Sequence, residues 1–475
     1  MTDPDTAALP PHQAAAVPLP TQRPRRRRAR LAGRASPART VAAWRADPER
    51  AAAIRDVWQA LWLSRLLVAL AGVATVLAFG FGPVRGAFDP PGVTRGFGSL
   101  GDLLAAPVAR WDSAWYLVIA HYGYHPALGH LTASRTAFFP LYPLLIRALT
   151  WIGSPPVAAG VLISLAAFAA GSYGLHRLTT LELRRRAVLA PDAARLAVLA
   201  SAFAPMAFFF SAVYTESLYL ALSVGVFWAA RNGRWAAAGA LGGLAAATRS
   251  TGLVLLVPAL MLYLYGPRED RPPERQRHAR RRVLPRYRLG ADALWLCLIP
   301  AGTALFSLGL ALAGGDALAP FRAQGIWGRH LAGPYFAVWD GLQAAFEGAR
   351  QLLSFQRAHV YFPAATGSPT VAAGHNLILF AFLLAALPAL VAVLRRLPAA
   401  YGVYVLLALA LPLSEPVSGQ PLMSLPRFLL VLFPLSIVSG EWLAAHPRAR
   451  RPLLGLSAAL MVVFLAQFAT WHWVA

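Results

Sequence analysis

One acidic side chain stands among tryptophans and tyrosines in the segment from Arg110 to Tyr124. Asp112 lies between Trp111 and Trp115 in the run Arg-Trp-Asp-Ser-Ala-Trp-Tyr. Aromatic side chains with polar tips prefer the membrane–water interface, where a carboxylate is partly desolvated. A desolvated acid is costly unless it has a partner or a chemical task, and no structural need calls for an acid here. We therefore expect Asp112 to be functional.

Three further charged residues occur at turns between apolar segments. Glu216 lies in the run Tyr-Thr-Glu-Ser, Arg249 in Ala-Thr-Arg-Ser, and Arg427 in Pro-Arg-Phe. Acidic and arginine groups that converge at one face of a helical bundle make a site for an anionic head group. Each residue also has a simpler explanation. Glu216 can be a first-turn acid favoured by the helix dipole, with Thr215 as N-cap, and either arginine can reach lipid phosphates.

Three histidines and two further arginines are also expected on the outer side of the membrane. His121, His359 and His375 show no metal-ligand spacing of the HExxH type. A single histidine beside aromatic residues is usually a packing residue, and His359, in the run Ala-His-Val-Tyr-Phe-Pro, is the one that we would test. Arg110 and Arg135 are expected to contact the surface or lipid head groups.

The signatures of soluble enzymes are absent from the sequence. It contains no GxxxxGK[ST] phosphate loop and no GxSxG elbow. It shows no clear set of metal ligands, although Asp112 together with Glu216 could hold one divalent ion. No cofactor is indicated. Gly239, Gly242 and Gly243 lie in an apolar segment, where small residues indicate close helix packing rather than a nucleotide loop.

The composition indicates a polytopic membrane protein. Of the 475 residues, 57% are hydrophobic and 13% are charged, which at this length excludes a set of soluble domains. The net charge of +24 comes from arginine, since the chain contains no lysine. The arginines cluster beside apolar segments as the positive-inside rule requires, and no nucleic-acid motif accompanies them. The single cysteine, Cys297, excludes an intramolecular disulfide.

The apolar pattern predicts an all-α fold with about eleven transmembrane helices. Residues 1–56 are predicted to form a disordered, arginine-rich cytoplasmic tail, and residues 57–475 the transmembrane domain. The N-terminus is placed in the cytoplasm and the C-terminus outside, in what we expect to be a bacterial plasma membrane. The predicted spans are 57–81, 156–177, 193–212, 214–231, 234–249, 251–266, 291–313, 375–394, 399–413, 428–445 and 453–473.

Two long loops face the outside in this topology. Residues 83–155 form the first loop, which contains Asp112 and a short apolar segment, 138–151. That segment holds two prolines and is too short to span, and treating it as re-entrant places every later arginine cluster inside. The second loop is 314–373 and is expected to contain local helices. Helical spacing in the first loop predicts an amphipathic helix along the outer surface, with one face made of Trp111, Trp115, Val118, Ile119 and Tyr122.

Several of these segments resemble the PIG-V mannosyltransferase family. The run from Trp111 to Tyr116, then Ile119-Ala120, Gly123-Tyr124 and Phe138 to Pro143, carries the resemblance. The segments 214–217, 247–250 and 426–428 are similar to further motifs of that family. The resemblance covers residues 109–252 well and the C-terminal half thinly. The arginine-rich tail and the loop 267–290 lie outside the pattern.

The resemblance implies a GT-C-like membrane glycosyltransferase with extracytoplasmic amphipathic helices. Such enzymes use a polyprenyl-phosphate sugar and place an acid in the first outer loop. The eukaryotic members of the family add the second mannose of the GPI anchor, an acceptor that does not carry over to a chain of bacterial composition. The implied reaction transfers mannose, or another hexose, from polyprenyl-phosphate mannose to a hydroxyl group of a glycan, glycolipid or protein, with inversion.

The resemblance also implies roles for residues. Asp112 and Glu216 would be catalytic, and Arg249 and Arg427 would bind the donor phosphate, without a resident metal. The substrate-binding candidates are Trp111, Tyr116, His121, Tyr214 and His359. Topology independently favours a lipid-linked donor, because nucleotide sugars are made in the cytosol and this site faces out. The alternative is a polytopic transporter or flippase of lipid-linked sugars, which predicts charges at the midplane and access from both sides.

Overall fold

The computed structural model describes residues 47–82, 92–94, 96–124, 135–186, 190, 192–273, 284–360 and 368–474. Over these ranges the chain is helical, apart from two isolated β-bridges. The chain divides into two units, Met1–Ala51 and Ala52–Ala475, and apart from the start of the first described helix the features described below lie in the second unit. This observation agrees with the predicted all-α class.

The first helix begins within the predicted tail. Helix α2 starts at Pro48, so the expected boundary after residue 56 is too late. The reason is a start signal in the sequence: Asp47 precedes a proline and accepts a hydrogen bond from the backbone N–H of Glu49 at 3.0 Å. An acidic cap followed by proline in the first turn is a strong helix start. Residues 1–46 lie outside the described part of the chain.

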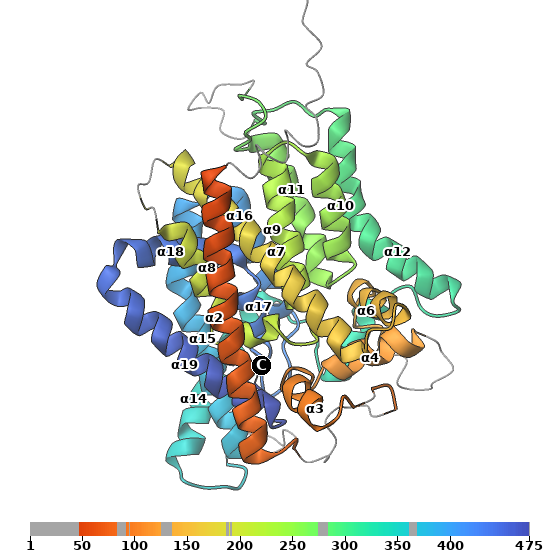
Figure 1. Cartoon of the computed structure of the whole chain (residues 1–475), viewed down its shortest axis with the longest axis vertical. Helices are drawn as coiled ribbons and strands as arrows, with labels where there is room; N and C mark the ends of the chain where they lie inside the picture. Colours follow the sequence, from red (N-terminus) through yellow and green to blue (C-terminus); the bar gives the residue numbers. More distant parts are fainter. Residues whose placement is uncertain are drawn as a thin grey trace, which may run out of the picture. The chain divides into compact units, whose positions relative to one another are not determined.

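The described helices differ widely in length. Figure 1 shows the short α17 amid the longer helices, with α3, α4 and α6 together at one end. In chain order the α-helices are α2 (Pro48–Phe79), α3 (Ser99–Ala105), α4 (Ser113–Tyr122), α6 (Leu141–Trp151), α7 (Pro156–Arg185), α8 (Ala193–Ala202), α9 (Glu216–Arg231), α10 (Trp235–Ala246), α11 (Leu256–Tyr265), α12 (Leu298–Leu312), α13 (Ala319–Arg322), α14 (Pro334–Leu353), α15 (Pro369–Arg396), α16 (Ala399–Leu413), α17 (Leu425–Leu430), α18 (Phe433–Ala445) and α19 (Pro447–Ala469).

Five helical stretches in the described ranges are long and apolar enough to cross a membrane. They are α2, α7, Ala291–Leu312, α15 and α19, and they make this an integral membrane protein. The other predicted spans fall on shorter helices; α9 has 16 residues and α10 has 12. The count of eleven spans and the orientation therefore remain predictions.

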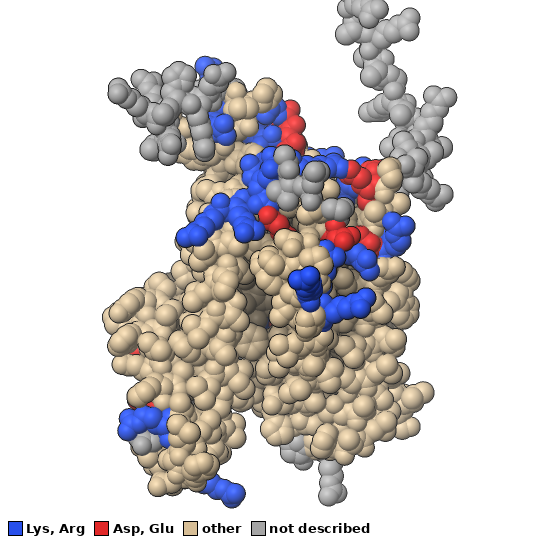
Figure 2. Space-filling view, turned by 90° about the vertical axis from the view of Figure 1, so that its left-hand side faces the viewer, with Lys and Arg blue, Asp and Glu red and all other residues tan. Residues whose placement is uncertain are grey.

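The long helices expose large apolar side chains, as helices in contact with lipid do. On α2, Trp58, Leu77 and Phe79 are 61%, 70% and 74% exposed. Figure 2 shows that on one face of the molecule most of the arginines gather toward one end and a smaller group lies near the other, with a broad surface without charge between them. An uncharged surface of this extent would be unstable in water and is suited to a bilayer.

Three of the arginine clusters meet at one place. Arg186, which follows α7, and Arg396, at the end of α15, both form ion pairs with Glu441 of α18. Arg450, near the start of α19, donates a hydrogen bond to the carbonyl oxygen of Leu443 at 2.8 Å. These clusters were all predicted to lie on the cytoplasmic side, and their convergence is compatible with that topology. The remaining cluster, 280–282, lies outside the described residues.

The three glycines of α10 allow α12 to approach closely. A Cβ atom on Gly239 would lie 1.9 Å from the carbonyl oxygen of Trp295, and one on Gly243 would lie 2.6 Å from the carbonyl oxygen of Leu298. No side chain fits into either gap. The predicted close helix packing is therefore confirmed.

We expect Gly239→Ala to destabilise the protein, because its methyl group would overlap the backbone of Trp295 in the 3-10 helix Ala291–Cys297, which leads into α12. These atoms cannot move without separating that segment from α10. Overpacking of this kind costs about 1–3 kcal/mol. The matched control is Gly455→Ala in α19, where a Cβ atom would meet nothing within 4 Å and helix propensity gains about 0.5–1 kcal/mol. Thermal unfolding in detergent should shift in opposite directions for the two variants. Equal shifts would contradict the close approach.

The first outer loop folds differently from its predicted amphipathic pattern. Helix α4 buries Tyr116 and Leu117, whereas Trp115 is half-buried and Tyr122 is 43% exposed. The predicted face is thus mostly the less buried one, because α4 packs its other side against α6 and α7. Helix α6 has 11 residues, a length that fits the predicted non-spanning segment.

Candidate active site

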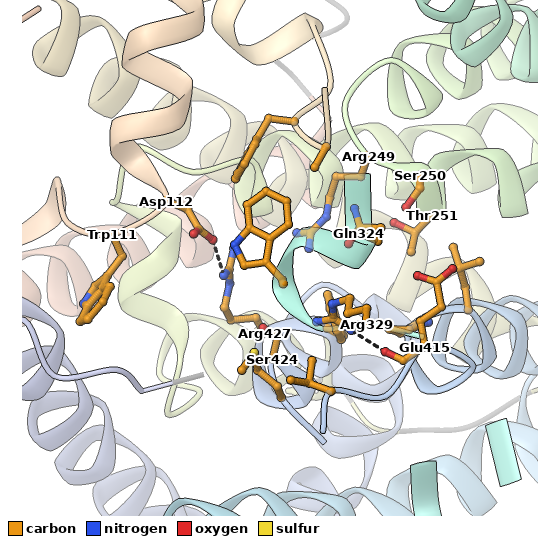
Figure 3. A pocket seen from close by; sticks show the side chains of 18 of the residues that line it. Trp111, Asp112, Arg249, Ser250, Thr251, Gln324, Arg329, Glu415, Ser424 and Arg427 are labelled. Atoms are coloured by element: carbon orange, nitrogen blue, oxygen red, sulfur yellow. Dashed lines mark hydrogen bonds and ion pairs between the residues drawn. The ribbon is translucent and has the colours of Figure 1, made fainter. Parts of the chain in front are cut away.

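A cavity of about 1830 Å³ opens beside the start of α4 (Figure 3). Its walls come from parts of the chain that are distant in sequence: the start of α4, the turn before α11, the loop after α13, the segment before α17 and α17 itself, and the residues after α19. Pockets for one small molecule usually measure roughly 300–1,000 Å³. This cavity has room for two substrates side by side.

Four charged side chains meet at the wall of this cavity, and we call them the Arg427 cluster: Asp112, Glu216, Arg249 and Arg427. Arg427 donates from Nη1 to Asp112 Oδ2 at 2.9 Å. Its Nε and Nη2 atoms donate to Glu216 Oε1 at 3.0 and 2.9 Å. Arg249 Nη1 lies 3.2 Å from the same glutamate oxygen, as an ion pair without hydrogen-bond geometry. The structure therefore brings these four residues together, as the sequence predicted.

Local structure explains why these side chains point toward one another. Asp112 precedes the first residue of α4, but its carboxylate caps no backbone N–H and is left to accept from Arg427. Glu216 is the first residue of α9, where the positive end of the helix favours an acid. Arg427 lies on α17, after Ser424 in the left-handed conformation (φ 68°) and a proline that starts the helix.

Burial makes this cluster sensitive to charge balance. Glu216 is fully buried, Arg427 is 6% exposed, and the Asp112 side chain keeps 21% exposure toward the cavity. Burial alone would lower the pKa of Arg427, but the carboxylates of Glu216 and Asp112 outweigh it and raise that pKa. The guanidinium also lies over the rings of Phe209 and Tyr214. Arg427 is thus a permanent cation that fixes both acids.

Two tyrosines lie beside Asp112, and one of them supports the turn that carries it. The Tyr214 hydroxyl accepts from the backbone N–H of Asp112 at 3.0 Å and donates to the carbonyl oxygen of Arg110 at 3.0 Å. Tyr214 is 1% exposed and is not among the cavity-lining residues, so its predicted role in substrate binding has no geometric support, and its contacts support the turn instead. Tyr116 lines the cavity, and its hydroxyl lies 3.3 Å from that of Thr215. Burial raises the pKa of Tyr116 to about 12, so it stays protonated.

Tryptophans form another part of the wall beside Asp112. Trp111 lines the cavity with Trp471 and Trp473, and we call these three residues the tryptophan wall. The ring centroids of Trp111 lie 5.6 Å from Trp471 and 5.3 Å from Trp473, both edge to face. Trp111 is thus placed where its predicted role in substrate binding requires. The two residues after α19 were not predicted.

The two histidines singled out in the sequence lie away from the cavity. His121 and His359 are exposed and are not among the lining residues, because one ends α4 on its outer side and the other follows α14 on the surface. Their predicted roles in substrate binding therefore have no geometric support. The histidine that does line the cavity is His375, on α15.

Two arginines expected at the surface are buried instead. Arg110 is fully buried, donates to the carbonyl oxygens of Ala469 and Phe81 at 3.2 and 3.1 Å, and stacks on Trp471. Arg135 is 3% exposed and donates to the carbonyl oxygen of Gly123 at 3.2 Å. The prediction failed because both guanidinium groups find backbone carbonyls as hydrogen-bond acceptors inside the fold. Arg110 ties the start of α4 to the end of α19, which keeps the tryptophan wall in place.

Sequence reasoning missed one arginine of the cavity. Arg329 lies in the second outer loop, lines the cavity, and donates to the carbonyl oxygen of Glu415 at 3.0 Å. Burial lowers its pKa. The loop is held by backbone hydrogen bonds from Ala332 and Gly333 to the carbonyl oxygen of Ser414. No motif surrounds Arg329, so only the fold reveals it. We call Arg249 and Arg329 the open arginines, since Arg427 is fully engaged.

No group of three or more His, Cys, Asp and Glu side chains is placed to hold a metal ion in the part of the chain that the structure describes. The pair considered from the sequence, Asp112 and Glu216, is bridged by Arg427. A metal between the two carboxylates would have to displace that guanidinium.

Known proteins resemble the part of the chain that builds much of this site. Residues 94–264 match the family described as mannosyltransferase (PIG-V), which confirms the resemblance read from the motifs. Two curated relatives, the GPI alpha-1,6-mannosyltransferase 2 of Rattus norvegicus and that of Mus musculus, are 34% and 32% identical over 182 and 183 residues.

The extent of the similarity is limited. The matches cover 35% and 36% of this chain and 34% and 35% of the relatives, so the chain spans about a third of the length of the curated relatives it matches. No solved structure matches the chain. The family region includes Asp112, Glu216 and Arg249 and ends before Arg329 and Arg427.

Proposed function

We propose that this chain, which over residues 94–264 is similar to the PIG-V mannosyltransferases, is a membrane mannosyltransferase. It transfers mannose from polyprenyl-phosphate mannose to a hydroxyl group of an acceptor outside the cytoplasm. The observation that supports this proposal most is a partly exposed carboxylate, Asp112, held by a buried arginine at the edge of a cavity that also holds the open arginines. The cavity therefore offers a base and a separate site for phosphate.

The reaction is a single displacement at the anomeric carbon. The acceptor hydroxyl gives its proton to Asp112 as its oxygen forms the new bond to that carbon. The bond from the anomeric carbon to the phosphate oxygen breaks, and the polyprenyl phosphate leaves with the electron pair. The configuration at the anomeric carbon inverts, so a β-linked donor gives an α-mannoside. Glu216 keeps Arg427, and through it Asp112, in position.

We assign the donor phosphate to the open arginines rather than to Arg427. All three nitrogens of Arg427 already donate to carboxylates, whereas Arg249 makes an ion pair without a hydrogen bond and Arg329 donates to one carbonyl. Preorganised guanidinium groups stabilise the charge that develops on a leaving phosphate. Val254, Val257 and Leu411 line the cavity on this side and would contact the polyprenyl chain.

Replacing either open arginine should weaken donor binding. We expect Arg249→Gln and Arg329→Gln each to raise the KM for polyprenyl-phosphate mannose by about 10–100-fold, since a charge-assisted hydrogen bond contributes roughly 1.5–3 kcal/mol. The control is Arg357→Gln, which removes an exposed arginine that does not line the cavity. The difference in affinity between farnesyl phosphate and neutral farnesol measures the contribution of the phosphate group to binding. If the variants bind both lipids as the wild type does, this assignment is wrong.

The proposal is tested with purified protein in lipid nanodiscs. Radiolabelled polyprenyl-phosphate mannose and a membrane extract should yield labelled product that resists mild acid, because mild acid cleaves the phosphate-linked sugar and leaves a glycoside intact. The alternative, transport of lipid-linked sugars, predicts movement of labelled donor across proteoliposomes without a new glycosidic bond. Movement without a covalent product would exclude the transferase.

A further inference from the structure

The cavity has two chemically different sides, separated by Asp112. Figure 3 shows Trp111 on one side of Asp112, and the open arginines on the other. The arginine side also carries the aliphatic residues of α11 and α16. The opposite side carries the tryptophan wall. A base that lies between two unlike surfaces implies that the two substrates occupy different sides.

The tryptophan side combines aromatic rings with uncharged hydrogen-bonding groups. Gln420, Gln467 and His375 line the cavity, and all three also line a small adjoining cavity together with Trp473. These side chains therefore lie close to one another. Amide and imidazole groups can donate and accept hydrogen bonds without adding a formal charge when the imidazole is neutral.

The backbone at this side is strained. Trp111 and Trp471 both have positive φ angles, 57° and 65°, a conformation that is unfavourable for a residue with a bulky side chain. Trp471 is held there by a hydrogen bond from its indole N–H to the carbonyl oxygen of Phe81 at 3.1 Å, and Arg110 stacks on its ring. Strain of this kind persists where the surrounding structure enforces it, which is common at binding sites.

The direction of the displacement assigns the two sides. The attacking oxygen and the leaving oxygen lie on opposite faces of the anomeric carbon, and the base must contact the attacking one. If the phosphate lies with the open arginines, then the acceptor hydroxyl lies on the far side of Asp112. That side is the tryptophan wall.

We propose that the tryptophan wall, together with Gln420, Gln467 and His375, is the acceptor subsite and that it binds an uncharged sugar ring. This inference rests on the proposed function. A sugar ring presents a C–H face that packs on an aromatic ring and a rim of hydroxyl groups that needs donors and acceptors. The subsite supplies both, and none of the described residues assigned to it is an arginine that could pair with an anionic acceptor. An acceptor hydroxyl on a sugar therefore fits better than one on a peptide side chain.

The test uses Trp473→Ala, Trp473→Phe and a distant control. Trp151→Ala is the matched control, because Trp151 is 77% exposed at the end of α6 and does not line the cavity. The acceptor probes are octyl α-mannoside and a serine-containing peptide, with polyprenyl-phosphate mannose as donor. Loss of one aromatic contact should raise the KM for the octyl mannoside about tenfold. The KM for the donor and its hydrolysis by water should not change.

Each outcome decides the matter. A rise in acceptor KM for Trp473→Ala, restored by Trp473→Phe and absent in Trp151→Ala, supports the subsite. Equal effects on donor and acceptor, or transfer to the peptide in preference to the glycoside, overturn it.

If the wild type transfers to neither probe, the proposed function is in question, and quenching of tryptophan fluorescence by the mannoside tests the subsite alone. Quenching in the wild type that Trp473→Ala weakens supports the subsite, and equal quenching in both overturns it. If Trp473→Ala does not elute as a folded monodisperse species, Gln467→Leu replaces it under the same criteria.

Discussion

Asp112→Asn is expected to lower the rate of mannosyl transfer by about 10²–10⁴-fold, the usual contribution of a general base. The amide is nearly the same size as the carboxylate and can still accept the hydrogen bond from Arg427, which is 2.9 Å long in the wild type. The backbone N–H of Asp112, which donates to Tyr214, is unchanged. The variant should therefore fold and bind donor, but it has no group to take the proton of the acceptor.

The measurement for this variant separates chemistry from binding. The kcat obtained from initial rates should fall. The Kd for farnesyl phosphate should stay within a factor of about three of the wild-type value. Asp316→Asn is the matched control, since that residue pairs with Arg322 on the surface of the second loop, where its side chain is 43% exposed. Near wild-type transfer by Asp112→Asn would remove Asp112 from the reaction, and Glu216 could not replace it because it is fully buried.

The second large effect concerns stability. Arg427→Met should destabilise the protein by about 3–5 kcal/mol, because it leaves the buried Glu216 with Arg249 alone and takes the partner from Asp112. The double variant Glu216→Gln/Arg427→Met should regain part of this loss, since it removes the buried charge as well as its partner. Both variants should lose activity, because neither holds Asp112 in place.

Thermal unfolding in detergent checks this prediction against an exposed pair. Arg322→Met breaks the ion pair with Asp316, in which the arginine side chain is 69% exposed. Such pairs contribute about 0.2–1 kcal/mol. A melting temperature of Arg427→Met close to that of Arg322→Met would mean that the cluster contributes no more to stability than a surface ion pair.

The parts of the site that could be predicted are those where a charge interrupts an apolar run. Asp112, Glu216 and Arg427 stand out because a charge in such surroundings needs a partner, and the structure gives each of them one. The spacing of the three glycines in α10 also predicts its close approach to a neighbouring helix, which the structure shows to be α12.

The parts that could not be predicted depend on contacts between distant segments. Arg329 lies in a loop of mixed charge, and Trp473 lies among residues that look like ordinary interface anchors. The residues that flank them in the sequence do not predict that they line this cavity. The predicted surface position of Arg110 was wrong for a related reason. Its hydrogen-bond partners are backbone carbonyls more than twenty residues away in the sequence. Such partners leave no mark on the sequence.

The link between Glu216 and Arg427 also has a consequence for biogenesis. The two residues are 211 positions apart, so a ribosome that adds roughly 5–20 residues per second completes the pair about 10–40 s after the acid has emerged. During that interval the nascent chain carries an acid at a position that is buried in the mature fold. Arg249 is synthesised soon after Glu216 and lies beside it in the finished protein. Of the two arginines that pair with Glu216, Arg249 is therefore available early in synthesis, and Arg427 only when α17 has been made.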